Sequence, residues 1–323
     1  MKDIKALPKV ELHVHLDGSL NPVSVASILN IPVSQATNNM VAPSKCIDLN
    51  DYLTKFDLCI EAMQEYDNIV LLTKEFVKTL EEDNVIYAEV RFAPMKHISK
   101  ISPDKVIEAV LEGIKNDKII INLILCMMRG DNLENNKKVI DLAKKYINKG
   151  VVAIDLAGAE GLFKTSDYKD LFKYAKDLNI PFTIHAGEAD GISSIKSAIQ
   201  FGSKRIGHGI RAVEDINLLE EIKLKKILLE ICPTSNIQTN ATSNIFTHPI
   251  RKIFDFGCLV SVNTDNRTVS NTSLNKEYKL IMDNLNFSID DLIKINEYSI
   301  MNSFADYDTK LYILNKIKNY RKD

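Results

Sequence analysis

The sequence predicts an α/β protein whose 323 residues form a single (β/α)8 barrel domain. Two observations predict this fold: short apolar runs recur along the chain, and amphipathic segments with helix-start signals separate them. Eight strands that are each followed by a helix favour a closed parallel barrel. An open doubly wound sheet would usually carry a glycine-rich turn after an early strand, and the sequence has none. We expect strands at residues 10–16, 85–92, 121–127, 151–156, 182–185, 205–208, 227–231 and 259–264.

Two helices carry clear start signals. Ser102 stands before Pro103 and Asp104 and a run of apolar residues that share one helical face. Ser288 and Asp291 have the spacing of a capping box ahead of another apolar face. We expect a helix to begin at each place.

The first connection, residues 17–84, is far longer than an ordinary βα loop and is helical in pattern. We expect it to form a helical cap over the barrel mouth. Within it, residues 51–65 carry apolar side chains at helical spacing. These side chains either cover a site at the mouth or only pack the helix against the barrel: Leu53, Phe56, Ile60 and Met63.

Composition and charge exclude several classes of function. Lys and Arg number 41 and Asp and Glu number 43, so the net charge of −2 indicates neither a nucleic-acid nor a membrane surface partner. No apolar stretch reaches the length of about 18 residues that a membrane span needs, and the N-terminus lacks the apolar core of a signal peptide. The five cysteines include no C-x-x-C pair and are typical of reduced thiols. We expect a cytoplasmic protein.

Two histidines near the end of the first expected strand point to a metal. His13 and His15 are two residues apart, so on a strand both imidazoles face the barrel interior. Two neutral rings in a confined space are costly unless their lone pairs are bound, and a divalent metal would bind them. A pair of hydrogen-bonded core histidines is the alternative for this motif taken alone.

Three more candidate residues fall at later strand ends. His185 and His208 end the fifth and sixth expected strands, and Asp265 follows the apolar run of the eighth. Because barrel strands end at one common mouth, these side chains should meet His13 and His15 there. Imidazole and carboxylate ligands without a thiolate suit zinc, which lowers the pKa of a bound water to about 7. We therefore expect one zinc ion per chain.

Hydrolysis at such a metal also needs a group that moves protons. Glu188 is the candidate, because it follows His185 by three residues and should lie near the mouth. A lone acid in this position would more often be a solvated loop residue. Beside the metal set, a proton shuttle is the better interpretation.

Seven segments of the chain resemble adenosine deaminases in order and spacing. They span residues 8–266, and together they combine H-x-H-x-D-G with HAGE, GHG and NTD, which is more specific than any single short motif. The zinc deaminases that act on polynucleotides carry H-x-E and P-C-x-x-C instead, and the sequence has no such site. The segments are PKVELHVHLDGSL, YAEVRFAP, AIDLAGAEG, TIHAGE, IGHGIR, LEICPTSN and SVNTDN.

The resemblance implies a role for each chemical residue. Glu188 would protonate the purine N1, which makes C6 electrophilic. His208 would orient and stabilise the attacking hydroxide. The metal ligands would be His13, His15, His185 and Asp265.

The resemblance also implies substrate contacts. The backbone N–H of Gly158 would contact purine N3, Asp17 would meet a ribose hydroxyl at the 5′ end, and Asn266 would meet purine N7. His15 would contact the substrate as well as the metal. An apolar lid over the nucleoside would consist of Leu49, Leu53 and Phe56.

Two positions are open. Glu230 is equally an orienting partner for a histidine or a structural charge at a strand end. The family usually has Asp-Asp-Pro where this chain has Asp265, Asn266 and Arg267. An amide donates to N7 without a pKa shift, so this change concerns base preference more than activity.

These observations predict zinc-dependent hydrolytic deamination of adenosine and 2′-deoxyadenosine to inosine and 2′-deoxyinosine, with release of ammonia. The partner is a small-molecule purine nucleoside, and the sequence identifies no protein partner. The alternatives are the same chemistry on adenine or on a 5′-modified adenosine, and a catalytically inactive nucleoside-binding relative. His97 and His248 match no catalytic motif, and we expect both to be structural.

Overall fold

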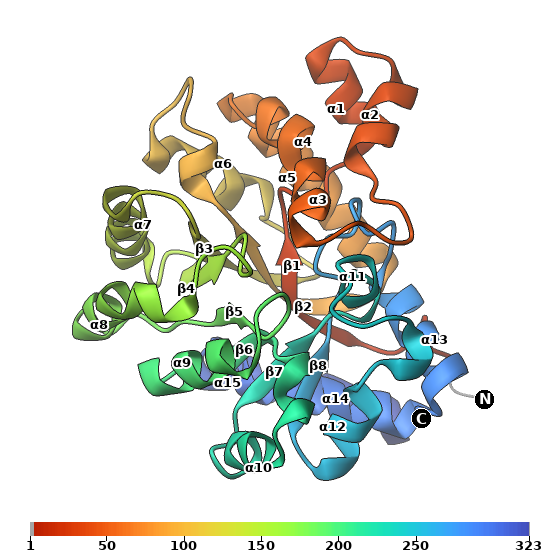
Figure 1. Ribbon diagram of the computed structural model, residues 1–323. Helices are drawn as coiled ribbons and strands as arrows, with labels where there is room; N and C mark the ends of the chain where they lie inside the picture. Colours follow the sequence, from red (N-terminus) through yellow and green to blue (C-terminus); the bar gives the residue numbers. More distant parts are fainter. Residues whose placement is uncertain (1–2, 323) are drawn as a thin grey trace.

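A ring of parallel strands surrounded by helices forms the protein, in a computed structural model that describes residues 3–322 (Figure 1). Strands that follow one another in the chain are neighbours, in the orders β1-β2-β3-β4 and β5-β6-β7-β8. Isolated parallel bridges join the two groups at both seams, Ile154 with Phe182 and Val14 with Asp265. This arrangement is the predicted (β/α)8 fold. Its strands are β1 (Lys9–His15), β2 (Val85–Phe92), β3 (Ile120–Met128), β4 (Val151–Ala157), β5 (Ile184–Ala186), β6 (Arg205–His208), β7 (Leu228–Ile231) and β8 (Leu259–Val262).

The structure confirms every expected strand but begins the fifth at Ile184 instead of residue 182 and shortens the eighth. β8 ends at Val262 instead of residue 264, because the chain turns on its way to Asp265, whose φ of 59° lies in the left-handed region. This turn still lies against β1. The N–H of His15 donates to the carbonyl of Asp265 (2.7 Å), and the N–H of Asp265 donates to the carbonyl of His13 (2.9 Å).

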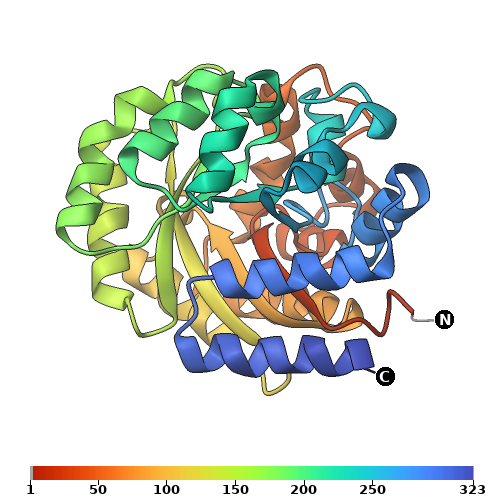
Figure 2. The same cartoon turned by 90° about the horizontal axis from the view of Figure 1, so that it is seen from below.

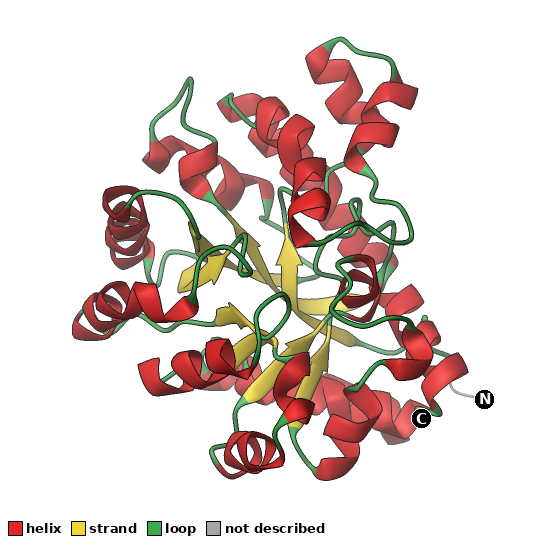
Figure 3. Cartoon of the chain, in the orientation of Figure 1, coloured by secondary structure: helices red, strands yellow, loops and turns green. Residues whose placement is uncertain are grey.

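Helices cover the outside of the ring (Figure 3). Both expected helix starts are present: Ser102 accepts a hydrogen bond from the N–H of Lys105, and Ser288 forms a complete capping box with Asp291. The helices are α1 (Pro22–Leu29), α2 (Val33–Met40), α3 (Leu49–Leu53), α4 (Asp57–Ala62), α5 (Tyr66–Glu82), α6 (Pro103–Gly113), α7 (Leu133–Tyr146), α8 (Lys169–Asp177), α9 (Ile192–Phe201), α10 (Ile216–Leu224), α11 (Pro233–Gln238), α12 (Ile250–Phe256), α13 (Leu274–Leu285), α14 (Ile289–Asn302) and α15 (Tyr307–Lys322).

The insertion between β1 and β2 consists of α1 to α5. The pattern over residues 51–65 predicts one helix, and this is wrong: α3, the 3-10 turn Thr54–Phe56 and α4 replace it. The Thr54 hydroxyl donates to the carbonyl of Asp51 (2.7 Å), which competes with regular helical bonding there. The apolar residues of this segment therefore divide. Met63 is fully buried in the core, whereas the others line a pocket: Leu53, Phe56 and Ile60.

The barrel interior holds a network of buried ion pairs. Arg91 donates to Asp155 and to Glu230, both at 2.7 Å, and Arg205 donates to Glu230 (2.6 Å) and to Glu89. All five side chains are almost fully buried. Such charges are tolerated in a core only when each has partners, so this network fixes the strands that carry them relative to one another.

The two ends of the described chain lie close together, beside α14 and α15 (Figure 2). The hydroxyl of Tyr320 donates to the carbonyl of Asp3 at 2.8 Å. Among residues 3–322, none of the helices has both the length and the apolar character needed to cross a membrane.

Candidate active site

A pocket opens at the carboxyl ends of the strands, where barrels of this fold bind their ligands. The sequence-predicted residues that line it are His15, Asp17, Leu49, Leu53, Phe56, Gly158, His185, Glu188, His208, Asp265 and Asn266. His13 and Glu230 lie deeper and are fully buried. The sequence missed other lining residues, among them Tyr52, Lys96, Cys126 and Met128.

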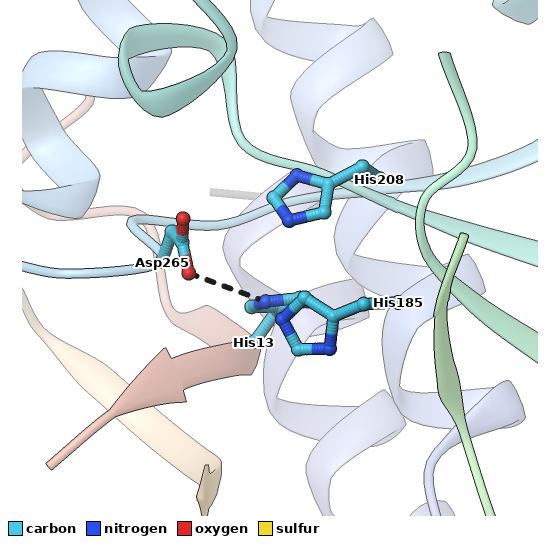
Figure 4. Close-up of side chains that lie close together, drawn as sticks. All are labelled: His13, His185, His208 and Asp265. Atoms are coloured by element: carbon cyan, nitrogen blue, oxygen red, sulfur yellow. Dashed lines mark ion pairs between the residues drawn. The ribbon is translucent and has the colours of Figure 1, made fainter. Parts of the chain in front are cut away.

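A cluster of metal-ligating atoms occupies the bottom of this pocket (Figure 4). His13, His185, His208 and Asp265 each offer one ligand atom, and these atoms lie within 4.8 Å of one another. His15 joins the cluster, because its Nε2 lies 3.2 Å from Nε2 of His185 and 3.4 Å from Oδ1 of Asp265. Lone pairs this close repel each other unless a proton or a metal ion lies between them. The buried Nε2 of His13 lies 3.3 Å from Oδ1 of Asp265 without forming a hydrogen bond, so the donor set fits a divalent metal.

Two buried carboxylates orient the histidines from behind. Nδ1 of His13 lies 2.9 Å from Glu230, and Nδ1 of His185 lies 2.9 Å from Asp155. Although burial opposes it, the guanidiniums of Arg205 and Arg91 hold the pKa of Glu230 well below its usual value. A carboxylate beside Nδ1 accepts a hydrogen bond from the Nδ1–H group, which keeps the proton on Nδ1 and leaves the Nε2 lone pair free for a metal.

Glu230 therefore contacts a histidine and also belongs to the structural ion-pair network. Both interpretations that the sequence left open thus apply to this residue. Asp155 is the equivalent residue that the sequence analysis missed. Its signal is a single acid within the apolar run VVAIDLA of β4. Nothing in that run indicates which histidine it would contact.

The tautomer of His208 follows from a chain of hydrogen bonds. The N–H of Ile250 donates to Nδ1 of His248 (3.2 Å), and burial lowers the pKa of His248 to about 3. The neutral His248 ring therefore carries its proton on Nε2, which lies 3.3 Å from Oδ1 of Asn236. Asn236 then donates through Nδ2 to Nδ1 of His208 at 3.0 Å.

Burial also lowers the pKa of His208 well below its usual value, so this ring is neutral and its one proton is on Nε2. That nitrogen lies 3.3 Å from Oε2 of Glu188 and acts as a donor. A protonated nitrogen has no lone pair for a metal. The network thus separates His208 from the other members of the cluster, although its ring lies beside theirs (Figure 4).

Glu188 sits over the cluster with its carboxyl buried. Its Oε1 accepts a hydrogen bond from the hydroxyl of Thr239 at 2.9 Å. Burial, together with the charges of Asp265 and Glu160, raises the pKa of Glu188 well above its usual value. A carboxyl in this state holds a proton near neutrality and can donate it to a bound molecule.

Asp17 has one carboxylate oxygen available to a ligand. Its Oδ2 accepts from the N–H of Ala93 (3.3 Å) and lies 3.5 Å from Nε2 of His97. Its Oδ1 is buried and has no partner. His97, expected to be structural, thus orients a pocket residue.

Asn266 lies at the junction of the polar and apolar sides of the pocket. Its Nδ2 donates to the hydroxyl of Tyr52 (3.0 Å), which is itself 2.6 Å from Oγ of Ser270. A Cβ at Gly18 would stand 1.9 Å from Oδ1 of Asn266, which explains why glycine follows Asp17. Tyr52 is the polar member of a segment whose other lining residues are apolar.

The apolar side of the pocket comes from α3, the turn after it and α4. We call Leu49, Leu53, Phe56 and Ile60 the apolar wall. Three of these side chains are only half buried, and they face the metal-ligating cluster across the pocket. A site with one dry face and one face of metal ligands suits a flat, partly apolar ring.

The fold and this cluster together define a (β/α)8 barrel with a metal site of histidine and aspartate at its mouth. Comparison with known proteins agrees: the family model described as adenosine deaminase matches residues 8–320. An adenosine deaminase of Haemophilus ducreyi is 38% identical and covers 96% of this chain and 95% of its own length. One from Enterococcus faecalis is 37% identical and covers 97% of both chains. The N6-methyl-AMP deaminase of Arabidopsis thaliana superposes with a TM-score of 0.87 at 27% identity, covering 98% of this chain and 97% of its own.

The chain therefore belongs to the adenosine deaminase family, a family of metal-dependent hydrolases.

Proposed function

We propose that the protein deaminates adenosine and 2′-deoxyadenosine by hydrolysis and holds one zinc ion per chain. The observation that carries this proposal is the buried Glu188 carboxyl, whose raised pKa makes it an acid, directly above a metal-ligating cluster. An amidine C–N bond needs both a ring-nitrogen acid and an activated water, and this pocket offers a group for each. The names of the relatives support adenosine as the substrate.

Zinc would be held by four residues that leave room for a water molecule. Its chemistry there is to lower the pKa of that water toward ~7, which supplies hydroxide at neutral pH. His208 carries its proton on Nε2 and would therefore orient the water by donating a hydrogen bond from that nitrogen, without joining the ligands. The proposed ligands are His13, His15, His185 and Asp265.

The chain's own groups hold the purine and move the protons. Glu188 donates its proton to N1, which draws electrons from C6 and opens that carbon to the water oxygen. The N–H of Gly158 donates to N3, and the Asn266 amide donates to N7 through the hydrogen that Tyr52 leaves free. The water brings two protons: one leaves with the 6-amino group as ammonia, and the other returns to the Glu188 carboxylate.

The sugar contact favours a nucleoside over a nucleotide. The unpartnered Oδ1 of Asp17 can accept a hydrogen bond from a free 5′-hydroxyl. A 5′-phosphate would bring about two negative charges to this buried carboxylate, where screening is weak. Lys96 also lines the pocket, but its ammonium is 3.8 Å from Asp131. One structural relative is named as a deaminase of a nucleotide, N6-methyl-AMP. Comparing the rates on adenosine and AMP is therefore the sharpest test of whether the substrate is a nucleoside or a nucleotide.

A substrate panel tests the proposal. We expect the fall in absorbance that marks inosine formation with adenosine and 2′-deoxyadenosine, and a much lower kcat/KM with AMP and with adenine. Asp17→Asn should lower the ratio of kcat/KM for adenosine to kcat/KM for AMP. Comparable rates on adenosine and AMP in the natural protein would contradict the nucleoside assignment, and a higher rate on adenine would make the base the substrate.

A further inference from the structure

One carboxylate outside the metal cluster accepts hydrogen bonds from an unusual number of backbone N–H groups. Glu160 stands in the segment that follows β4, and its side chain is only 2% exposed. Its two oxygens accept hydrogen bonds from four successive backbone N–H groups and one hydroxyl, at 2.5 to 3.1 Å. The donors are the N–H groups of Gly187, Glu188, Ala189 and Asp190 and the hydroxyl of Ser194.

The same short loop has its carbonyl groups fixed from the other side. Arg129 donates to the carbonyl of His185 (2.6 Å), and Arg211 donates to the carbonyl of Glu188 (3.1 Å). The N–H of Gly209 donates to the carbonyl of Ala186 (3.0 Å). Donors and acceptors of the loop are thus satisfied by different neighbours, and Glu160 accepts from all four N–H groups of residues 187–190.

This loop has no secondary structure of its own to fix it. It runs from the end of β5 to Gly191, just before α9, and Gly187 adopts the left-handed region with a φ of 77°. Without a carboxylate at this place, the buried N–H groups of Gly187 and Glu188 would lose their partner, and an unsatisfied buried donor is destabilising. The loop would then move to find other acceptors. Glu188 is part of this loop, so its carboxyl would move too.

We propose that Glu160 is a positioning residue for Glu188, acting through the backbone of residues 187–190. The inference rests on the proposed function, in which Glu188 donates to purine N1. Glu160 follows Gly158 by two residues, so one segment after β4 carries both the N3 contact and the anchor of the N1 acid. This anchoring fixes the two ring contacts relative to each other, which general-acid catalysis requires.

The variant Glu160→Gln tests this, because an amide has one acceptor oxygen where the loop offers donors to two. We expect kcat for adenosine to fall roughly 10- to 100-fold, with KM changed by less than about threefold and the metal content unchanged. Glu214→Gln is the matched control. Glu214 is half exposed and pairs with Arg211 beside the same loop, but it accepts no backbone bond, and it should leave kcat unchanged.

A double-mutant cycle distinguishes positioning from general damage. If Glu160 acts through Glu188, then adding Glu160→Gln to Glu188→Gln should change the residual rate less than about twofold. The proposal would be overturned if the double variant lost the product of the two single fold-losses in kcat. It would also be overturned if the kcat of Glu160→Gln equalled that of the natural protein.

Hydrogen exchange on the natural protein covers the case in which Glu160→Gln does not fold. The amides of residues 187–190 should exchange as slowly as those of β6, and rapid exchange would overturn the proposal. This measurement needs no turnover. If the natural protein fails to deaminate adenosine, the proposed function falls, while slow exchange still confirms the backbone anchor.

Discussion

The polar side of the pocket is carried by strand ends and the turns after them, whereas the apolar wall is carried by short helices of the insertion. Three of its histidines have an orienting partner behind them: Glu230 behind His13, Asp155 behind His185, and Asn236 behind His208. The residues of the apolar wall have no such partners. They are held by packing, and the neighbouring Tyr52 hydroxyl forms a hydrogen bond with Asn266 on the polar side.

This difference indicates which part of the site determines the rate of the reaction and which part determines the affinity for the substrate. Groups that move protons or hold a metal must keep their geometry to within a fraction of an ångström, and buried hydrogen bonds supply that precision. An apolar wall contributes area removed from water, which depends little on exact orientation. We therefore expect changes on the polar side to lower kcat or metal affinity, and changes on the apolar wall to raise KM.

The largest expected effect comes from the acid itself. Glu188→Gln should keep its metal and still bind purine, yet lose about 10²- to 10⁴-fold in kcat, because the amide cannot donate a transferable proton to N1. Steady-state kinetics and metal analysis on the same preparation measure both. A Glu188→Gln enzyme within about tenfold of the natural rate would end the proposed role.

The second effect concerns the partners behind the histidines. Glu230→Gln should weaken metal binding by about 10- to 100-fold, because the amide no longer fixes the His13 tautomer. Competition with a chelator measures it, and complete metal removal should abolish turnover and lower Tm. Glu89→Gln is the matched control: it removes a buried acid from the same arginine network but touches no histidine. Equal metal loss in both variants would assign Glu230 a structural role only.

The third effect should appear in KM. Phe56 is half buried in the pocket, and Phe56→Ala removes about 1 kcal/mol of contact with the nucleoside, or roughly a fivefold rise in KM with kcat largely kept. Phe246→Ala, at a side chain that is 75% exposed, serves as the control and should change neither constant. A loss in kcat that exceeds the rise in KM would show that the apolar wall helps catalysis directly.

The smallest effect tests the hydrogen bond between Tyr52 and Asn266, which joins the two sides. Tyr52→Phe keeps the ring but frees the Asn266 amide, so discrimination between adenosine and 7-deazaadenosine, which lacks N7, should fall about threefold. Inhibition constants measure it. Tyr87→Phe removes another buried hydroxyl, bonded to Glu89 at 2.7 Å, and should leave that discrimination intact. If Tyr52→Phe and the natural protein discriminated equally between the two nucleosides, this would contradict the role of Asn266 as an N7 donor oriented by Tyr52.

The sequence predicted the polar residues of the pocket better than it predicted the residues that support them. Strand periodicity and the histidine positions sufficed for β1 to β8 and for the residues at the mouth, because local patterns determine both. Asp155, Glu160 and Asn236 were missed, since their partners lie about 28 to 30 residues away in the chain, a distance no local pattern records.

The helix break after α3 was missed for another reason. The apolar spacing of residues 51–65 fits a continuous helix, and only the hydroxyl of Thr54 argues against it. In the interrupted segment Phe56 and Ile60 line the pocket, whereas Met63 is buried in the core. The family resemblance therefore predicted Leu49, Leu53 and Phe56 of the apolar wall, but it predicted neither Ile60 nor the shape of the segment.

The most direct test of the account is turnover of adenosine by the metal-loaded protein in water enriched in ¹⁸O. We predict one ¹⁸O atom at C6 of each inosine formed and one ammonia released per inosine, with Glu188→Gln giving the same products far more slowly. Adenosine recovered unchanged, or converted to free adenine, would contradict the central claim that this pocket hydrolyses the 6-amino group.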